Sequence, residues 1–177
     1  MFTRRTLVAA QCRDWAMATD WDPDDMAKVA FHEAGHAVVM WLLSVPIKRI
    51  RLDLNTQGGS VNPNVDAEVA ARQSLLEVMA ARYAGPIAES MFGGPPNQNT
   101  ERRAEDDDEW AGWQLNKNGV APSGADGQSL KTRGRSWAEE LLRRHESRVR
   151  QIAKRLLQPR YKITREQFEQ MMQEEDC

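Results

Sequence analysis

The chain has 177 residues, with 24 Lys and Arg against 26 Asp and Glu, a formal net charge of -2 and 41% apolar residues. This balance excludes an intrinsically disordered chain, and it excludes a protein that is basic enough throughout to bind nucleic acid over its whole surface. The two cysteines, Cys12 and Cys177, form neither a metal-binding spacing nor a disulfide framework, and no apolar run approaches the ~20 residues of a membrane helix. We therefore expect one soluble cytoplasmic domain over residues 1–177, without an export signal.

The first strong structural signal is a helix over residues 23–43, which follows an N-terminal arm of residues 1–22. Asp22 is a favourable N-cap residue, and Pro23 suits the first helical position. Pro46 requires the helix to end before it.

A small sheet is predicted after this helix. Ile50, Leu52 and Leu54 alternate with polar residues, which is typical of a half-buried strand. Residues 55–59 have turn composition, and a short return strand is expected to begin at Ser60.

The rest of the chain is predicted to be mostly helical. Gly85 and Pro86 should kink or divide the next helix, and Thr164 with Gln167 resembles a capping box for the last one. The predicted helices are 66–92, 101–116 and 135–158, with loops at 93–99 and 118–128 and a short helix after Thr164. The expected fold class is mainly α (α+β), with a small two- or three-stranded sheet.

One pattern in the first helix indicates a metal-binding site. It is His32-Glu33-Ala34-Gly35-His36, an H-E-x-x-H sequence. Residues i and i+4 share a helix face, so His32 and His36 can bind one Zn2+ ion from a rigid backbone. Glu33 is then placed to act as the general base that takes a proton from the attacking water. Gly35 costs the helix about 1 kcal/mol relative to alanine, so we expect another segment to approach its backbone closely.

A catalytic zinc site usually has three protein ligands, so a third residue is needed. The metzincin pattern would place a histidine at position 42, where this chain has Leu42. His145 lies on the apolar stripe of a predicted helix, where a packed or partly exposed histidine is expected. The third ligand is therefore expected to be a carboxylate.

The segment Phe31 to Val39 resembles the zinc-binding helix of the peptidase domain of the FtsH family of AAA+ zinc proteases. The order of several later segments also agrees with that family. These segments are 47–52 followed by 58–61, the segment 84–89 (similar to the family's G-G-x-x-A-E, with Ala84 and Pro86 as departures), and the acidic run 105–109. The resemblance implies a helical zincin-like peptidase domain, with a zinc-site region at 23–117 and a C-terminal helical region at 129–177.

The resemblance also suggests which carboxylate completes the site. In the family pattern an alanine follows the ligand aspartate by four positions, which selects Asp107 before Ala111. Asp106 and Asp108 remain alternatives, because the preceding loop does not fix the register.

Two glutamates on the predicted helix 66–92 form a further alternative. Either Glu89 or Glu77 as third ligand would give a thermolysin-like site. The glutamate that matches Glu89 in the FtsH-like pattern is not a ligand, so Asp107 is preferred.

The activity that the resemblance implies is that of a zinc metalloendopeptidase acting on peptides or unfolded chains. The length leaves no room for the ATPase module of the family, so we expect ATP-independent hydrolysis. The substrate is expected to add as a strand along residues 50–54. The candidate partners, besides the substrate, are a separate ATPase or a second copy of this chain.

A second hypothesis comes from the charge distribution. Residues 131–165 contain 12 Lys or Arg and 3 Glu, a local net of +9. This stretch would suit a non-catalytic zinc-containing scaffold that binds nucleic acid or an acidic partner. No recognised nucleic-acid reader motif accompanies it, and such charges are more typical of a solvated helix face, so nucleic acid is the less favoured partner.

Overall fold

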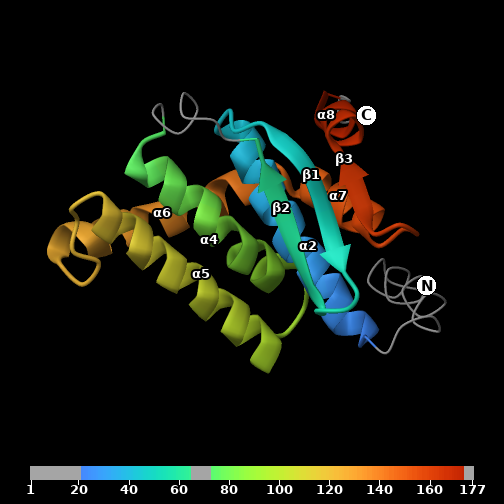
Figure 1. Cartoon of the computed structure of the whole chain (residues 1–177), viewed down its shortest axis with the longest axis horizontal. Coiled ribbons are helices and arrows are strands. Elements are labelled where there is room, and N and C mark those ends of the chain that lie inside the picture. The colour runs from blue at the N-terminus through green and yellow to red at the C-terminus, as the bar shows by residue number, and fades with distance from the viewer. Residues whose placement is uncertain (1–20, 65–72, 174–177) are drawn as a thin grey trace.

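Helix α2, Pro23–Leu42, lies at the centre of the fold, between a small sheet and the other helices (Figure 1). The computed structural model describes residues 21–64 and 73–173, so most of the predicted N-terminal arm lies outside the described residues. The described elements are α2, β1 (Ile47–Asp53), β2 (Gly58–Pro63), α4 (Leu75–Phe92), α5 (Gln98–Lys117), α6 (Ala125–Arg144), α7 (Glu146–Leu156), β3 (Lys162–Thr164) and α8 (Arg165–Gln173). The mainly helical class with a small sheet is confirmed.

The start of α2 follows the predicted capping. The Asp22 side chain accepts a hydrogen bond from the Asp24 backbone N–H at 3.0 Å, and Pro23 occupies the first helical position. Through its middle the helix is covered on nearly all sides: Val29 and Val38 are completely buried. A helix enclosed in this way holds any functional side chain on a rigid backbone.

The sheet is antiparallel, with the strand order β2-β1-β3. Ile50 at the centre of β1 is paired with Val61 of β2 on one side and with Ile163 of β3 on the other. The prediction that substrate adds along residues 50–54 is therefore wrong, because both edges of that strand are already used by the chain's own backbone. Within the described residues, β2 has a neighbouring strand on one side alone and leaves its other edge for pairing.

Helix α4 begins later than predicted. Ser74 and Glu77 form a capping box, in which the Ser74 N–H donates to Glu77 Oε2 at 2.6 Å and the Ser74 hydroxyl accepts from the Glu77 N–H at 3.3 Å. The helix therefore starts at Leu75, and residues 66–72 of the predicted helix lie outside the described residues. Pro86 does not divide it, and α4 continues to Phe92.

The predicted helix 135–158 is wrong as a single element. The chain forms α6 and α7, with a break at His145, whose φ of -115° and ψ of 29° are not helical. Tertiary packing explains the break, because α7 places Val149 and Ile152 in the core that it shares with α2. The predicted loop 118–128 is also shorter, since α6 already begins at Ala125.

The C-terminal elements match their sequence signals. The Thr164 N–H donates to Gln167 Oε1 at 3.1 Å, and the Gln167 N–H donates to Thr164 Oγ1 at 3.4 Å, so the predicted capping box is present at the start of α8. Phe168 of α8 is completely buried against Trp41, with ring centroids 5.7 Å apart. Among the described helices, none combines the length and the apolar character needed to cross a bilayer.

Candidate metal centre

The two histidines of the H-E-x-x-H pattern lie side by side on one face of α2. Their Nε2 atoms are 3.1 Å apart, and both side chains are almost completely buried. Gly35 lies between them in the sequence, and a β-carbon there would stand 2.5 Å from the backbone oxygen of Ala84. The close approach predicted at this glycine is therefore present, and it brings α4 against α2.

Asp107 of α5 completes a group of three possible ligands. Its Oδ2 lies 3.2 Å from the Nε2 of His32 and 3.6 Å from the Nε2 of His36. All three residues are buried, and they form one group that could hold a metal ion.

The neighbouring aspartates point elsewhere. Asp106 is exposed at the rim of the pocket. Asp108 accepts hydrogen bonds from the Tyr83 hydroxyl at 2.7 Å and from the Lys131 ammonium at 2.8 Å. Of the three predicted alternatives, Asp107 is the one that the structure brings to both histidines.

The other ring nitrogen of each histidine is engaged as a donor. His36 Nδ1 is 2.8 Å from the carbonyl oxygen of Ala81, and His32 Nδ1 is 3.1 Å from Glu89 Oε2. Because a carbonyl and a carboxylate can only accept, both protons belong on Nδ1 in the neutral rings. The Nε2 lone pairs then face each other and Oδ2 of Asp107.

Glu89 therefore contacts His32 on the nitrogen that faces away from the group, and Glu77 is held in the cap of α4. Neither glutamate is placed as a third ligand. Arg103 of α5 pairs with both oxygens of Glu89, with Nη2 at 2.5 Å from Oε1 and Nε at 3.1 Å from Oε2, and it also contacts Asp25 at 3.1 Å.

This pairing sets the charge of the buried Glu89. Burial raises its pKa, but the hydrogen bonds from His32 and Arg103 outweigh burial and lower the pKa to about 2. Sequence reasoning missed Arg103 and Asp25, because they lie 14 and 64 residues from Glu89 and no local pattern links them.

The geometry of the three residues fits a divalent cation. A tetrahedral ion with bonds of about 2.0–2.1 Å separates its ligand atoms by roughly 3.3–3.4 Å, close to the 3.1–3.6 Å found here. Within the described part of the chain, no hydrogen bond of acceptable geometry reaches the buried Oδ2 of Asp107. Three lone pairs directed at one point are unfavourable unless a cation or a proton lies between them.

The acidic neighbours of His32 favour its protonated form. Burial alone would lower the pKa of His32, but the Asp107 and Glu89 carboxylates beside it raise the pKa to about 9. Metal binding at Nε2 of His32 is therefore coupled to the release of a proton.

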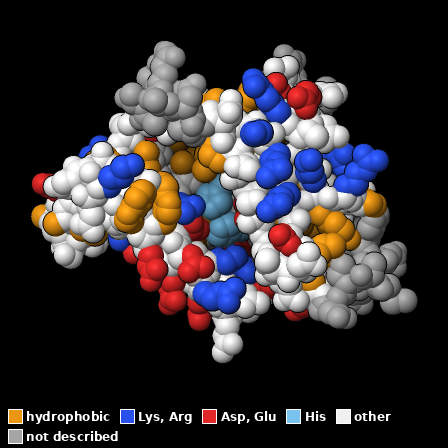
Figure 2. Space-filling model, in the orientation of Figure 1, with side chains coloured by type: hydrophobic (Ala, Val, Ile, Leu, Met, Phe, Trp, Pro, Cys, Tyr) orange, Lys and Arg blue, Asp and Glu red, His pale blue; other side chains and the backbone are white. Residues whose placement is uncertain are grey.

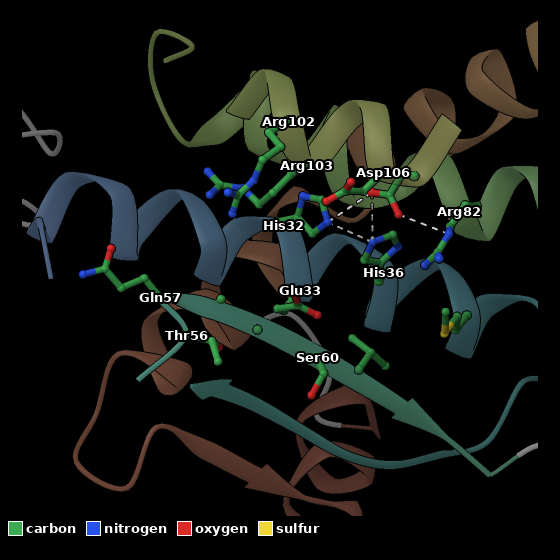
Figure 3. A pocket seen from close by; sticks show the side chains of 15 residues that line it. His32, Glu33, His36, Thr56, Gln57, Ser60, Arg82, Arg102, Arg103 and Asp106 are labelled. Atoms are coloured by element: carbon green, nitrogen blue, oxygen red, sulfur yellow. Dashed lines mark hydrogen bonds and ion pairs between the residues drawn. The ribbon is translucent and has the colours of Figure 1, made fainter. Parts of the chain in front are cut away.

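Glu33 lies between the histidines and strand β2 (Figure 3). A β-carbon on Gly59 of β2 would stand 2.5 Å from Glu33 Cγ, so a glycine at this position leaves the room that the carboxylate occupies. Burial raises the pKa of Glu33; the charges of His32 and His36 oppose this rise.

These groups line one pocket of about 340 Å³, which includes both histidines, Glu33, residues 56–61 and part of α5. In Figure 2 the surface of the histidines is visible at the bottom of a hollow, with basic side chains on the side of the sheet. The hollow lies between β2 and α5, since residues of both elements line it.

The two tryptophans of α5, Trp110 and Trp113, are not core residues. Trp113 is 55% exposed. The Arg82 guanidinium instead covers the Trp110 ring, with its carbon 4.1 Å from the ring centroid. Arg82 also contacts Asp107, and no local pattern in the sequence indicates this role.

Residues 6–94 match the model of a family described as Peptidase M50B-like. The chain belongs to this family. The matched segment contains α2, β1, β2 and α4 of the M50B-like chain, and it ends before α5, so Asp107 lies outside it. No curated protein matched the chain. The family match supports a metallopeptidase; it names M50 peptidases and not FtsH, so the FtsH resemblance is not tested by it.

Proposed function

We propose that this M50B-like chain is a zinc-dependent endopeptidase that hydrolyses flexible peptides or unfolded chains without ATP. The main support for the proposal is that Asp107 lies next to both histidines, beside the buried Glu33. The family match supports peptidase chemistry, and the resemblance to the FtsH peptidase domain supports the same roles for His32, Glu33 and His36.

His32, His36 and Asp107 would hold the metal, with each histidine fixed through its Nδ1 hydrogen bond. A zinc ion supplies a Lewis acid that polarises the scissile carbonyl and lowers the pKa of the attacking water. Glu33 accepts the proton of that water and then donates it to the leaving amine. The raised pKa of Glu33 suits this exchange, because a carboxyl with a pKa nearer neutrality both takes and returns a proton readily.

The substrate would be oriented by the edge of β2 that no other strand of residues 21–64 and 73–173 occupies. Gly58, Gly59 and Ser60 line the pocket beside Glu33, and an extended peptide can add its backbone hydrogen bonds to a strand edge. A strand edge can pair only with an extended segment, which supports flexible peptides as the substrate class.

A non-catalytic scaffold that uses the basic stretch 131–165 has less support. Basic side chains of α6 and α7 pair with glutamates one turn earlier: Arg143 with Glu139, Arg144 with Glu140, and Arg150 with Glu146. Such pairs are typical of a solvated helix face.

Hydrolysis of an unfolded, fluorescently labelled casein tests the proposal. We expect cleavage by the zinc-loaded wild type, none after chelation, and a loss of at least about a hundredfold in Glu33→Gln, the lower range for removing a general base. Glu33→Gln should still bind one zinc ion. Equal cleavage by wild type and Glu33→Gln would rule out the assigned mechanism.

A further inference from the structure

Arg82 of α4 connects two residues of α5. Its Nε lies 3.1 Å from Oδ1 of Asp107, and its guanidinium carbon lies 4.1 Å from the centroid of the Trp110 ring. Figure 3 shows the Arg82 side chain beside His36, at the end of the group opposite Arg103. The Arg82 side chain is 26% exposed and that of Asp107 is 7% exposed, so water screens their interaction only partly.

The two oxygens of Asp107 therefore face different partners. Oδ2 faces the Nε2 atoms of His32 and His36, whereas Oδ1 faces Arg82. A carboxylate can rotate about its Cβ–Cγ bond and can offer a metal one oxygen or both. Among the described residues the Arg82 Nε–H makes no hydrogen bond of acceptable geometry, so its contact with Oδ1 is an ion pair, and the positive charge of Arg82 favours the orientation in which Oδ1 faces it.

We propose that Arg82 is a positioning residue, which holds Oδ1 of Asp107 so that the carboxylate offers a metal Oδ2 alone. This proposal rests on the proposed metal site. Its consequence is a site with three protein ligand atoms, which is the number that leaves a catalytic metal open to water and substrate.

Trp110 keeps the guanidinium in place. Trp110 follows Asp107 by three residues, so both side chains lie on one face of α5, toward Arg82. A planar guanidinium can stack on the indole and pair with the carboxylate at the same time, whereas a lysine ammonium cannot do both. The stacking on Trp110 therefore fixes where the charge of Arg82 lies relative to Oδ1 of Asp107.

The visible absorption spectrum of the Co2+-loaded protein tests this role. Four-coordinate Co2+ absorbs strongly in the visible range, and additional oxygen ligands weaken the absorption. We expect a strong spectrum for the wild type and for Arg133→Met, which removes an exposed arginine of α6. Arg82→Met should give a weaker and shifted spectrum, and Arg82→Lys should resemble Arg82→Met, because the charge alone does not fix the carboxylate.

A role of Arg82 in folding alone would lower the melting temperature of the metal-free protein and leave the cobalt spectrum unchanged. A spectrum of Arg82→Met that matches the wild type therefore overturns the proposal. Should Arg82→Met fail to fold, Trp110→Leu and Arg82→Lys provide the same comparison, and wild-type spectra in both variants overturn it equally. If the wild type binds neither Co2+ nor Zn2+, the metal site itself is wrong and both proposals fall.

Discussion

Gly85 of α4 lies directly against the ligand nitrogen of His32: a β-carbon on Gly85 would stand 2.7 Å from His32 Nε2, and it would lie still closer to Nε2 of His36. The missing side chain thus leaves free the space toward which both ring nitrogens point. Both rings are anchored through Nδ1, so they cannot turn away without losing a buried hydrogen bond.

Gly85→Ala should therefore weaken zinc binding. We expect a loss of about ten- to a hundredfold in affinity, the range seen when the groups that orient metal ligands are disturbed. Isothermal titration calorimetry with zinc measures the affinity of each variant.

Gly112→Ala is the matched control, since the nearest atoms to its β-carbon would be those of Pro122 at 3.8 Å. Alanine in that helix should leave zinc affinity unchanged and favour the helix by up to about 1 kcal/mol. Equal zinc affinity in Gly85→Ala and Gly112→Ala would show that the space at Gly85 is not the metal site.

The three adjacent aspartates should respond differently to alanine. Asp107→Ala should lose zinc, whereas Asp106→Ala should bind it like the wild type, because Asp106 is exposed at the rim of the pocket. Asp108→Ala should also keep zinc but lose about 1 kcal/mol of stability, the upper value for partly exposed ion pairs. Its carboxylate joins Tyr83 and Lys131. Zinc content per chain and urea unfolding separate these outcomes; retention of zinc by Asp107→Ala would count against the assignment.

The low pKa of Glu89 predicts how the stability of the metal-free protein responds to acid. Its pKa is about 2 in the folded protein against 4.5 for a free glutamate, because His32 and Arg103 outweigh the effect of burial. Its contribution to stability is therefore complete above about pH 4.5 and disappears as the pH falls toward 2. A pKa difference of this size corresponds to a contribution of roughly 3 kcal/mol to the free energy of unfolding.

The stability of the metal-free wild type should fall over this pH range, and Glu89→Gln should show a smaller fall, since a glutamine does not titrate. Urea unfolding from pH 6 to pH 3 measures both slopes. Equal slopes would mean that Glu89 is not the titrating group.

Zinc should also stabilise the fold by mass action. At a free zinc concentration of 100 times the dissociation constant, the gain is about 2.7 kcal/mol, or roughly 5–10 °C in melting temperature for a chain of this size. Glu33→Gln should show the same gain, and His36→Ala should show none. A gain that persists in His36→Ala would indicate a different zinc site.

The sequence was sufficient for the elements whose signals are local. The Asp22 cap, the Thr164 capping box and the H-E-x-x-H spacing depend on residues within one or two helical turns, and each is found where it was predicted. The resemblance to FtsH pointed to Asp107, which lies 75 residues beyond His32 in the sequence but beside it in the fold.

The features that the sequence missed depend on tertiary contacts. The break at His145 carries neither glycine nor proline, and it exists because α7 packs on α2. Strand β3 has three residues, too few for a periodic pattern, yet it pairs with β1 and leaves β2 at the edge. Arg82 and Arg103 reach the site from α4 and α5, and no short-range pattern distinguishes them from surface arginines.

The most direct test of the metal centre is the anomalous diffraction signal at the zinc absorption edge, from crystals of the wild type grown with one equivalent of zinc. The assignment predicts one strong peak, about 2.0–2.1 Å from Nε2 of His32, from Nε2 of His36 and from one oxygen of Asp107. A zinc peak bonded to other residues, or to the two histidines without Asp107, would contradict it.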